Sequence, residues 1–136
     1  MQPHRPLPPP SYPVELRPPD ISLYRAGNAG VDYVHRFASG RAGPHVLVTA
    51  LVHGNELCGA IALDWLLRGG FRPAQGVLTL AFCNVAAFEH FDPAAPGESR
   101  FMDEDFNRVW SRERLEGGGS SIELRRAREL RPVVDA

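Results

Sequence analysis

Two polar clusters in this sequence combine residue types that could do chemistry. The first, "HGNE" at residues 53–56, places a histidine and a glutamate three residues apart, directly after the apolar run 46–52. An imidazole nitrogen and a carboxylate oxygen can converge on one cation when the histidine ends a strand and the glutamate lies in the first turn of a helix. His53 and Glu56 are therefore candidate metal ligands.

The same four residues have a simpler interpretation. Asn55 could cap the helix, Glu56 could favour its positive end, and His53 could be a strand-end histidine without a ligand role. The pattern H-x-x-E occurs often by accident, so the pair alone leaves both interpretations open.

The second cluster is "SRFMDEDFNRVW" at residues 99–110, in which charged and amide side chains alternate with aromatic ones. The guanidinium forks of Arg100 and Arg108 match a carboxylate in a bidentate manner, and the amide of Asn107 adds a directed donor. A surface patch of paired charges would have the same composition. The interleaved aromatic residues favour a segment packed onto a sheet, which would aim some of these charges inward.

Apolar runs indicate the elements that position the two clusters. Residues 45–52, "HVLVTALV", and 76–84, "GVLTLAFCN", are typical of strands covered on both faces. Helical spacing predicts a helix over 56–68, between these strands. "HGNE" then lies at the carboxyl end of a strand, where sheets of this class bind ligands.

The flanking segments complete the predicted architecture. "ISLYR" and "VDYVHRF", separated by "AGNAG", predict a hairpin. Residues 85–119 are predicted to be mostly irregular, and Ser120 and Glu123 have the capping-box spacing of a last helix that runs towards Pro132. This order of elements predicts an α/β fold, with a mixed, mainly parallel sheet and flanking helices.

The first twenty residues form a distinct region, because eight of them are proline. Proline removes backbone donors and favours an extended conformation, so residues 1–20 are predicted to be an arm and residues 21–136 the folded domain. A P-x-x-P ligand for an aromatic groove, through Pro3, Pro6 and Pro9, is a second interpretation of this arm.

Composition limits the class of protein. The 136 residues, 43% hydrophobic and 23% charged, suit one soluble domain, and a net charge of −1 provides no broad positive field for nucleic acid or anionic lipid. No apolar stretch reaches the roughly 18 to 20 residues of a membrane span. Cys58 and Cys83 form no C-x-x-C pair, which favours a cytoplasmic protein without disulfides. We expect a small-molecule partner.

Three motifs in order, "HGNE", "CNVAAFE" and "RFMDEDFNR", resemble the succinylglutamate desuccinylase and aspartoacylase family, relatives of the zinc carboxypeptidases. The resemblance covers roughly residues 21–136 and implies the N-terminal part of a zinc carboxypeptidase-like catalytic domain. It also implies a cofactor, Zn²⁺, bound by His53 and Glu56, and hydrolysis of the amide bond of an N-acyl amino acid. Arg100 would steady the oxygen of the scissile carbonyl, and Asn107 and Arg108 would grip the substrate carboxylate.

The sequence departs from the family pattern in several places. Phe106 stands where leucine is usual, and Val85 where proline is common. The family's third zinc ligand, a histidine in a pattern like D-x-H-S, and its catalytic glutamate would follow "RPVVDA", where this sequence stops. His45 lies at the far end of the strand that leads to His53 and is excluded as a substitute, whereas His90 is not.

These departures lead to expectations about the chain as a whole. We expect the 136-residue chain to be inactive alone, and either to self-associate or to be accompanied by the residues that it lacks, because an incomplete sheet exposes an edge. The alternative function is a non-catalytic domain that binds a small carboxylate through an arginine pocket.

Overall fold

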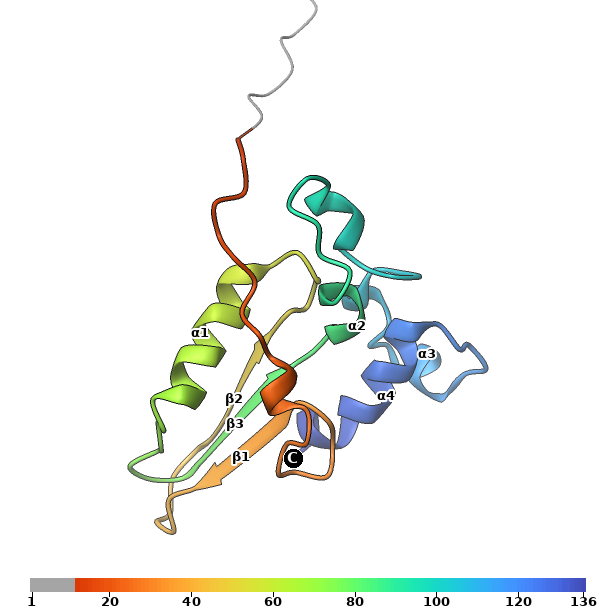
Figure 1. The fold of residues 1–136 in the computed structure, drawn as a ribbon. Helices are drawn as coiled ribbons and strands as arrows, with labels where there is room; N and C mark the ends of the chain where they lie inside the picture. Colours follow the sequence, from red (N-terminus) through yellow and green to blue (C-terminus); the bar gives the residue numbers. More distant parts are fainter. Residues whose placement is uncertain (1–11) are drawn as a thin grey trace, which may run out of the picture.

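The computed structural model describes residues 12–136 (Figure 1). More than half of the predicted proline-rich arm, with Pro3, Pro6 and Pro9, lies outside the described residues. None of the described helices is long and apolar enough to cross a membrane.

The centre of the fold is a three-stranded sheet. Its strands are β1 (Val34–Ala38), β2 (His45–Ala50) and β3 (Val77–Phe82), in the order β1-β3-β2. Strand β1 is antiparallel to β3, and β2 is parallel to it. The predicted α/β fold with a mixed sheet and flanking helices is thus confirmed, but the sheet is not mainly parallel, since one of its two pairings is antiparallel.

Helices connect and cover these strands. Helix α1 (Leu57–Arg68) is the crossover that a parallel pair such as β2 and β3 requires. The other α-helices are α2 (Val85–Phe88), α3 (Arg112–Glu116) and α4 (Ile122–Val134). The 3₁₀ turns are η1 (Ser22–Tyr24), η2 (Pro96–Ser99) and η3 (Phe106–Arg108).

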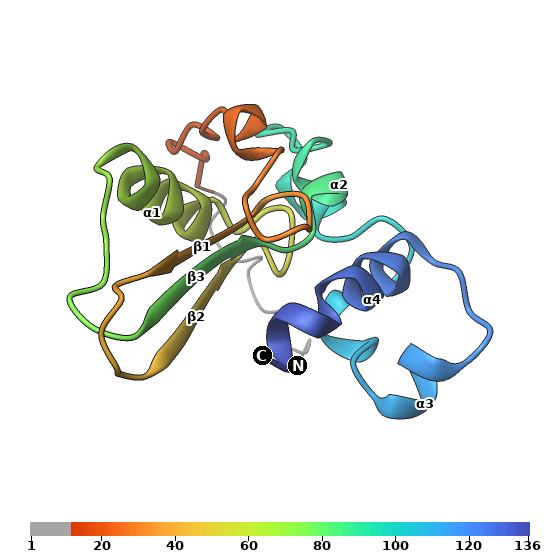
Figure 2. The ribbon, with the colours of Figure 1, turned by 90° about the horizontal axis from the view of Figure 1, so that it is seen from below.

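Two hydrophobic cores lie on opposite faces of the sheet. Leu80 and Phe82 of β3 pack in the core with α1, whereas Ala81 and Cys83 pack in the core with α4. Figure 2 shows α1 and α4 on opposite sides of the sheet. The alternation of side chains along β3 therefore produces a three-layer arrangement in which the ends of β2 and β3 lie between two helices.

The predicted N-terminal hairpin is wrong in its first half. "ISLYR" forms the 3₁₀ turn η1, because the Asp20 carboxylate accepts hydrogen bonds from the N–H and the hydroxyl of Ser22. The partly buried Tyr24 ring stacks on Phe82, so η1 packs against the sheet through this one side chain and does not pair with β1 as a strand. Only the second segment, around Val34–Ala38, is a strand.

Strand β2 is not covered on both faces, as its apolar run predicted. It is an edge strand of the described sheet, and Val46 and Val48 are 46% and 37% exposed. The central strand β3 fits that prediction, with five consecutive buried residues.

Two details of the last helix also differ. Ser121, not Ser120, caps α4, and its hydroxyl accepts a hydrogen bond from the Leu124 N–H. The Glu123 side chain takes no part in a capping box and bonds elsewhere. The helix continues through Pro132 to Val134.

Candidate metal centre

His53 and Glu56 lie in the turn between β2 and α1. Helix α1 begins at Leu57, with Glu56 at its N-cap position and no side-chain capping bond, so the predicted alternative in which Asn55 caps the helix is wrong. The Glu56 carboxylate instead turns back to accept a hydrogen bond from the His53 N–H at 3.2 Å. The turn thus brings the imidazole and the carboxylate to the same place.

The His53 side chain bonds a carboxylate at each ring nitrogen. Its Nδ1 lies 2.8 Å from Glu56 Oε1, and its Nε2 lies 3.0 Å from Asp105 Oδ1. His53 is only 3% exposed, so the ring is fixed in a buried position while Glu56 reaches solvent. The Nδ1 nitrogen and the Glu56 carboxylate therefore lie side by side, and Asp105 forms a hydrogen bond with the Nε2 nitrogen on the opposite side of the ring.

Asp105 is a site residue that the sequence reasoning did not select. Hydrogen bonds from His53 and from the Asn107 N–H lower the pKa of Asp105 to about 2. An ionised carboxylate hydrogen-bonded to the imidazole fixes the orientation of the ring. Such a carboxylate is a usual second partner of a metal-binding histidine. Fifty-two residues separate Asp105 from His53. The spacing rules that found Glu56 therefore could not find Asp105.

Arg100 reaches the same cluster from η2. Its guanidinium lies 3.4 Å from Asp105 Oδ2, and its carbonyl accepts the Gly54 N–H at 3.1 Å. The side chain is 46% exposed, which leaves part of the guanidinium facing solvent. The structure therefore brings Arg100 together with His53 and Glu56 through Asp105.

Asn107 and Arg108 lie on the outer side of the 3₁₀ turn η3. Both residues are exposed, whereas Phe106 beside them is 1% exposed and packs edge-on against Trp110. The buried Phe106 ring anchors the turn and so fixes the direction in which its two polar neighbours point.

The backbone around His53 is tightly constrained. Leu51 has φ of +59°, a left-handed conformation that favours glycine, yet its side chain is 1% exposed. A Cβ added at Gly54 would lie 2.4 Å from the Ser99 oxygen and 2.5 Å from the Phe88 nitrogen. A strained backbone at Leu51 and a close backbone approach at Gly54 thus flank His53. Strained backbone of this kind is often found at functional sites.

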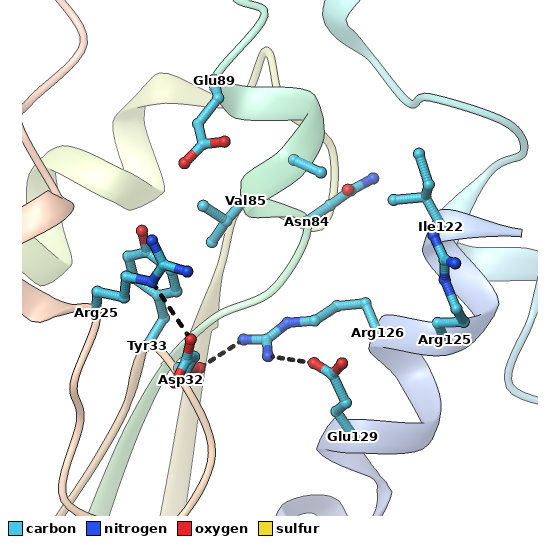
Figure 3. A pocket seen from close by; sticks show the side chains of 11 residues that line it. Arg25, Asp32, Tyr33, Asn84, Val85, Glu89, Ile122, Arg125, Arg126 and Glu129 are labelled. Atoms are coloured by element: carbon cyan, nitrogen blue, oxygen red, sulfur yellow. Dashed lines mark hydrogen bonds and ion pairs between the residues drawn. The ribbon is translucent and has the colours of Figure 1, made fainter.

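A separate hollow of about 320 Å³ lies between the loop before β1, α2 and α4 (Figure 3). Figure 3 shows Arg126 bonded to Asp32 and Glu129, and Arg25 paired with Asp32. The lining holds as many arginines as carboxylates: Arg25, Arg125, Arg126, Asp32, Glu89 and Glu129. Neither His53 nor Glu56 lines it, so this hollow is not the candidate metal centre.

Two side chains of the described residues, His53 and Glu56, lie close enough together to bind one metal ion. Zinc binds nitrogen and oxygen at about 2.0–2.2 Å, so two atoms 2.8 Å apart can both reach one ion. Within residues 12–136, however, no group of three or more His, Cys, Asp and Glu side chains is placed to hold a metal. His90 bonds the Ala86 carbonyl and does not join the pair.

Comparison with known proteins decides the family. Residues 42–136 match the sequence profile of the succinylglutamate desuccinylase/aspartoacylase catalytic domain, and this range includes every site residue named above. The chain belongs to this family. A similar family member is a "Probable aspartoacylase" of Parasynechococcus marenigrum (strain WH8102), 35% identical over 85 residues.

The match to that relative is partial in length. It covers 62% of this chain and 26% of the relative, so the chain spans about a quarter of the curated relative that it matches. No solved structure matches the chain. The family is therefore shown by sequence, and the fold of residues 12–136 by the structure described above.

Proposed function

We propose that this chain contributes to a zinc-dependent hydrolase that cleaves the amide bond of an N-acyl amino acid. His53 and Glu56 are the proposed zinc ligands, Arg100 the group that steadies the carbonyl oxygen, and Asn107 and Arg108 the carboxylate clamp. The carboxypeptidase-like architecture and a cytoplasmic location are part of the same proposal. Family membership and the small N-acyl substrates that it implies support it.

One observation carries the proposal. His53 is held between two carboxylates, one local and one distant, at the point where a strand becomes a helix. A metal-binding histidine usually donates its other ring N–H to a carboxylate, the position that Asp105 occupies, and Glu56 beside the remaining nitrogen offers a second ligand.

The residues of the site have distinct roles in the proposed reaction. A bound zinc ion would supply Lewis acidity and a water of lowered pKa. Asp105 holds the His53 ring in one orientation, and Arg100 presents a positive charge that stabilises a developing oxyanion. Asn107 and Arg108 orient the substrate through its free carboxylate.

The first prediction tests the metal centre. Replacement of Glu56 by alanine removes the carboxylate beside His53 Nδ1, so the complete enzyme that we propose should lose its stoichiometric zinc while its circular dichroism spectrum stays largely unchanged. Elemental analysis after gel filtration in zinc-containing buffer measures the metal.

Glu113→Ala is the matched control, because Glu113 is an exposed glutamate on α3. It should retain the zinc content of the wild-type protein. Equal zinc in Glu56→Ala and in wild type would remove Glu56 from the ligand set.

A further inference from the structure

Glu123 is a fully buried carboxylate that the proposed chemistry does not use. It lies in the first turn of α4 and is 0% exposed. A buried carboxylate is retained only where hydrogen bonds replace its hydration. The identity of its partners therefore indicates what Glu123 does.

Three of its four partners are consecutive backbone N–H groups of the segment before Asp105. The N–H of Met102 donates to Glu123 Oε1 at 2.6 Å, and those of Asp103 and Glu104 donate to Oε2 at 3.0 and 3.3 Å. The fourth partner, the Asn84 side-chain amide at the end of β3, donates to Oε1 at 3.1 Å. Glu123 thus ties the segment 102–104 to both α4 and the sheet.

The segment also bonds back to α4. The Asp103 carboxylate accepts the Ile122 N–H at 2.7 Å, and the Glu104 carboxylate bonds the Ser121 hydroxyl. Residues 101–105 form no helix or strand, so their position depends on these contacts. The next residue after the segment is Asp105, whose carboxylate supports His53.

We propose that Glu123 is a positioning residue of the metal centre: it fixes the segment 102–104 and thereby sets the Asp105 carboxylate against His53 Nε2. This inference rests on the proposed function, because it assigns Glu123 to the same centre. The hydrogen bonds of the Glu123 side chain go to Asn84 and to the segment 102–104 and not to His53 or Glu56, so its proposed effect passes through the segment and Asp105.

The proposal requires a carboxylate at this position. An ionised carboxylate offers only acceptors, and its two oxygens can accept all four N–H donors. Glutamine has the same size, but its NH₂ group is a donor and would face N–H groups that are themselves donors. Glu123→Gln should therefore release segment 102–104, whereas Glu123→Asp keeps the acceptors and should restore part of the contact.

The test uses the 136-residue chain, labelled with ¹⁵N, as wild type, Glu123→Gln and Glu123→Asp. Tyr24→Phe is the matched control, since it removes a partly buried 2.7 Å hydrogen bond to Asp64 on the other side of the sheet. The first readout, without metal, is the ring ¹⁵N resonances of His53 and the amide exchange of residues 102–104. The second readout is the affinity for Co²⁺, which is measured from the paramagnetic shifts that the bound ion causes.

We expect Glu123→Gln to shift the His53 Nε2 resonance, to speed amide exchange at 102–104, and to weaken Co²⁺ binding by about tenfold or more. Glu123→Asp should lie between it and wild type, and Tyr24→Phe should change Co²⁺ affinity less than about twofold despite a lower Tm. Adding Glu123→Gln to Asp105→Asn should cost less than the two single changes together, because both act on one contact.

The outcomes separate the two proposals. If wild type binds Co²⁺ through His53 but Glu123→Gln leaves the ring resonances and affinity unchanged, the positioning role is wrong and the metal centre stands. If Glu56→Ala leaves Co²⁺ binding unchanged while Glu123→Gln shifts the His53 resonances, the metal centre is wrong and Glu123 still positions the Asp105 carboxylate against the His53 ring. Should Glu123→Gln not fold, a wild-type spectrum and affinity in Glu123→Asp, with its shorter side chain, would overturn the positioning role.

Discussion

At the scale of single residues, the site depends on one local and one distant partner of His53. Glu56 is three residues away, so its place beside Nδ1 could be predicted from spacing. Asp105 reaches Nε2 across 52 residues, through a segment without regular structure. The sequence could show Asp105 as one acid among several in "DEDFNR", but no rule of spacing distinguishes it from Asp103.

Arg108 provides a test of the substrate clamp in the complete enzyme that we propose. Arg108→Lys keeps the positive charge but loses the planar fork, so kcat/KM for an N-acyl amino acid should fall about tenfold or more, about 1.4 kcal/mol of transition-state stabilisation. Steady-state kinetics measures the change.

Arg112→Lys is its control, since Arg112 is exposed and, among residues 12–136, forms an ion pair with Glu116 alone, across one helical turn. It should keep wild-type kinetics. The same result for Arg108→Lys would place Arg108 outside the substrate site.

Gly54 tests the close approach beside His53. An added Cβ would meet backbone atoms of Ala87, Phe88 and Ser99 at 2.4–2.5 Å, so Gly54→Ala should lower the free energy of unfolding by more than about 2 kcal/mol. Urea denaturation measures the loss.

Gly97→Ala is the control, because an added Cβ there has nothing within 4 Å. Its effect should stay within about 0.5 kcal/mol. Equal stability of the two variants would show that the turn at Gly54 is looser than the structure indicates.

At the scale of elements, sequence patterns predicted what is local and apolar. The runs at 45–52 and 76–84 are strands β2 and β3, and α1 follows its helical spacing. The patterns failed where a side chain supplies a hydrogen bond that periodicity does not show, as Asp20 does in turning "ISLYR" into η1. They also failed to show that β2 lies at an edge, because an apolar run is the same whether or not a neighbour covers it.

Glu123 illustrates the same limit. Its spacing from Ser120 predicted a capping box, yet Ser121 caps α4 and Glu123 turns to the segment 102–104. A carboxylate in the first turn suits either arrangement. Only the position of a segment twenty residues earlier decides between them.

Glu123 also predicts how stability depends on pH. Burial opposes its ionisation, but the N–H donors of Met102 and Asp103 and the amide of Asn84 outweigh burial and lower the pKa of Glu123. A lowered folded-state pKa means that its contribution to stability is present above the ordinary glutamate pKa and is lost as pH falls through the folded value. The free energy of unfolding should therefore fall more steeply in wild type than in Glu123→Gln as the pH falls from about 6 through the lowered folded-state pKa.

Urea titrations across this range measure the difference between the two proteins. Glu113→Gln, an exposed substitution on α3, should give a curve parallel to wild type. Parallel curves for wild type and Glu123→Gln would contradict the lowered pKa.

At the scale of the whole molecule, strand β2 forms an exposed edge of the described sheet, which separates the two hydrophobic cores. Val46 and Val48 are exposed there, and a small apolar groove of about 140 Å³ runs between β2, β3 and α4, with Leu47, Val52 and Trp110 in its lining. An edge with unpaired backbone groups and valine side chains can pair with another chain. The self-association predicted from the sequence stays a prediction, and β2 is the surface that would carry it.

The candidate site also predicts the behaviour of the 136-residue chain on its own. Two proposed ligands, His53 and Glu56, hold zinc weakly compared with the three protein ligands of catalytic zinc sites. Water activation also needs a general base whose pKa lies near the working pH, and the pKa of Asp105, about 2, is too low for that role. The purified chain should therefore show no zinc-dependent turnover of N-acyl amino acids, whereas the complete enzyme should.

The measurement is deacylation by the 136-residue chain, with its mass confirmed and zinc added, against the same chain carrying Glu56→Ala. Equal background rates in the two proteins are the expected result, because neither assembles a zinc-bound water with a base. Turnover that needs both zinc and Glu56 would show that a third ligand and a base lie within the chain. His90 would then be the residue to replace first, because its bond to the Ala86 carbonyl at 2.8 Å uses Nδ1 and commits only one ring nitrogen.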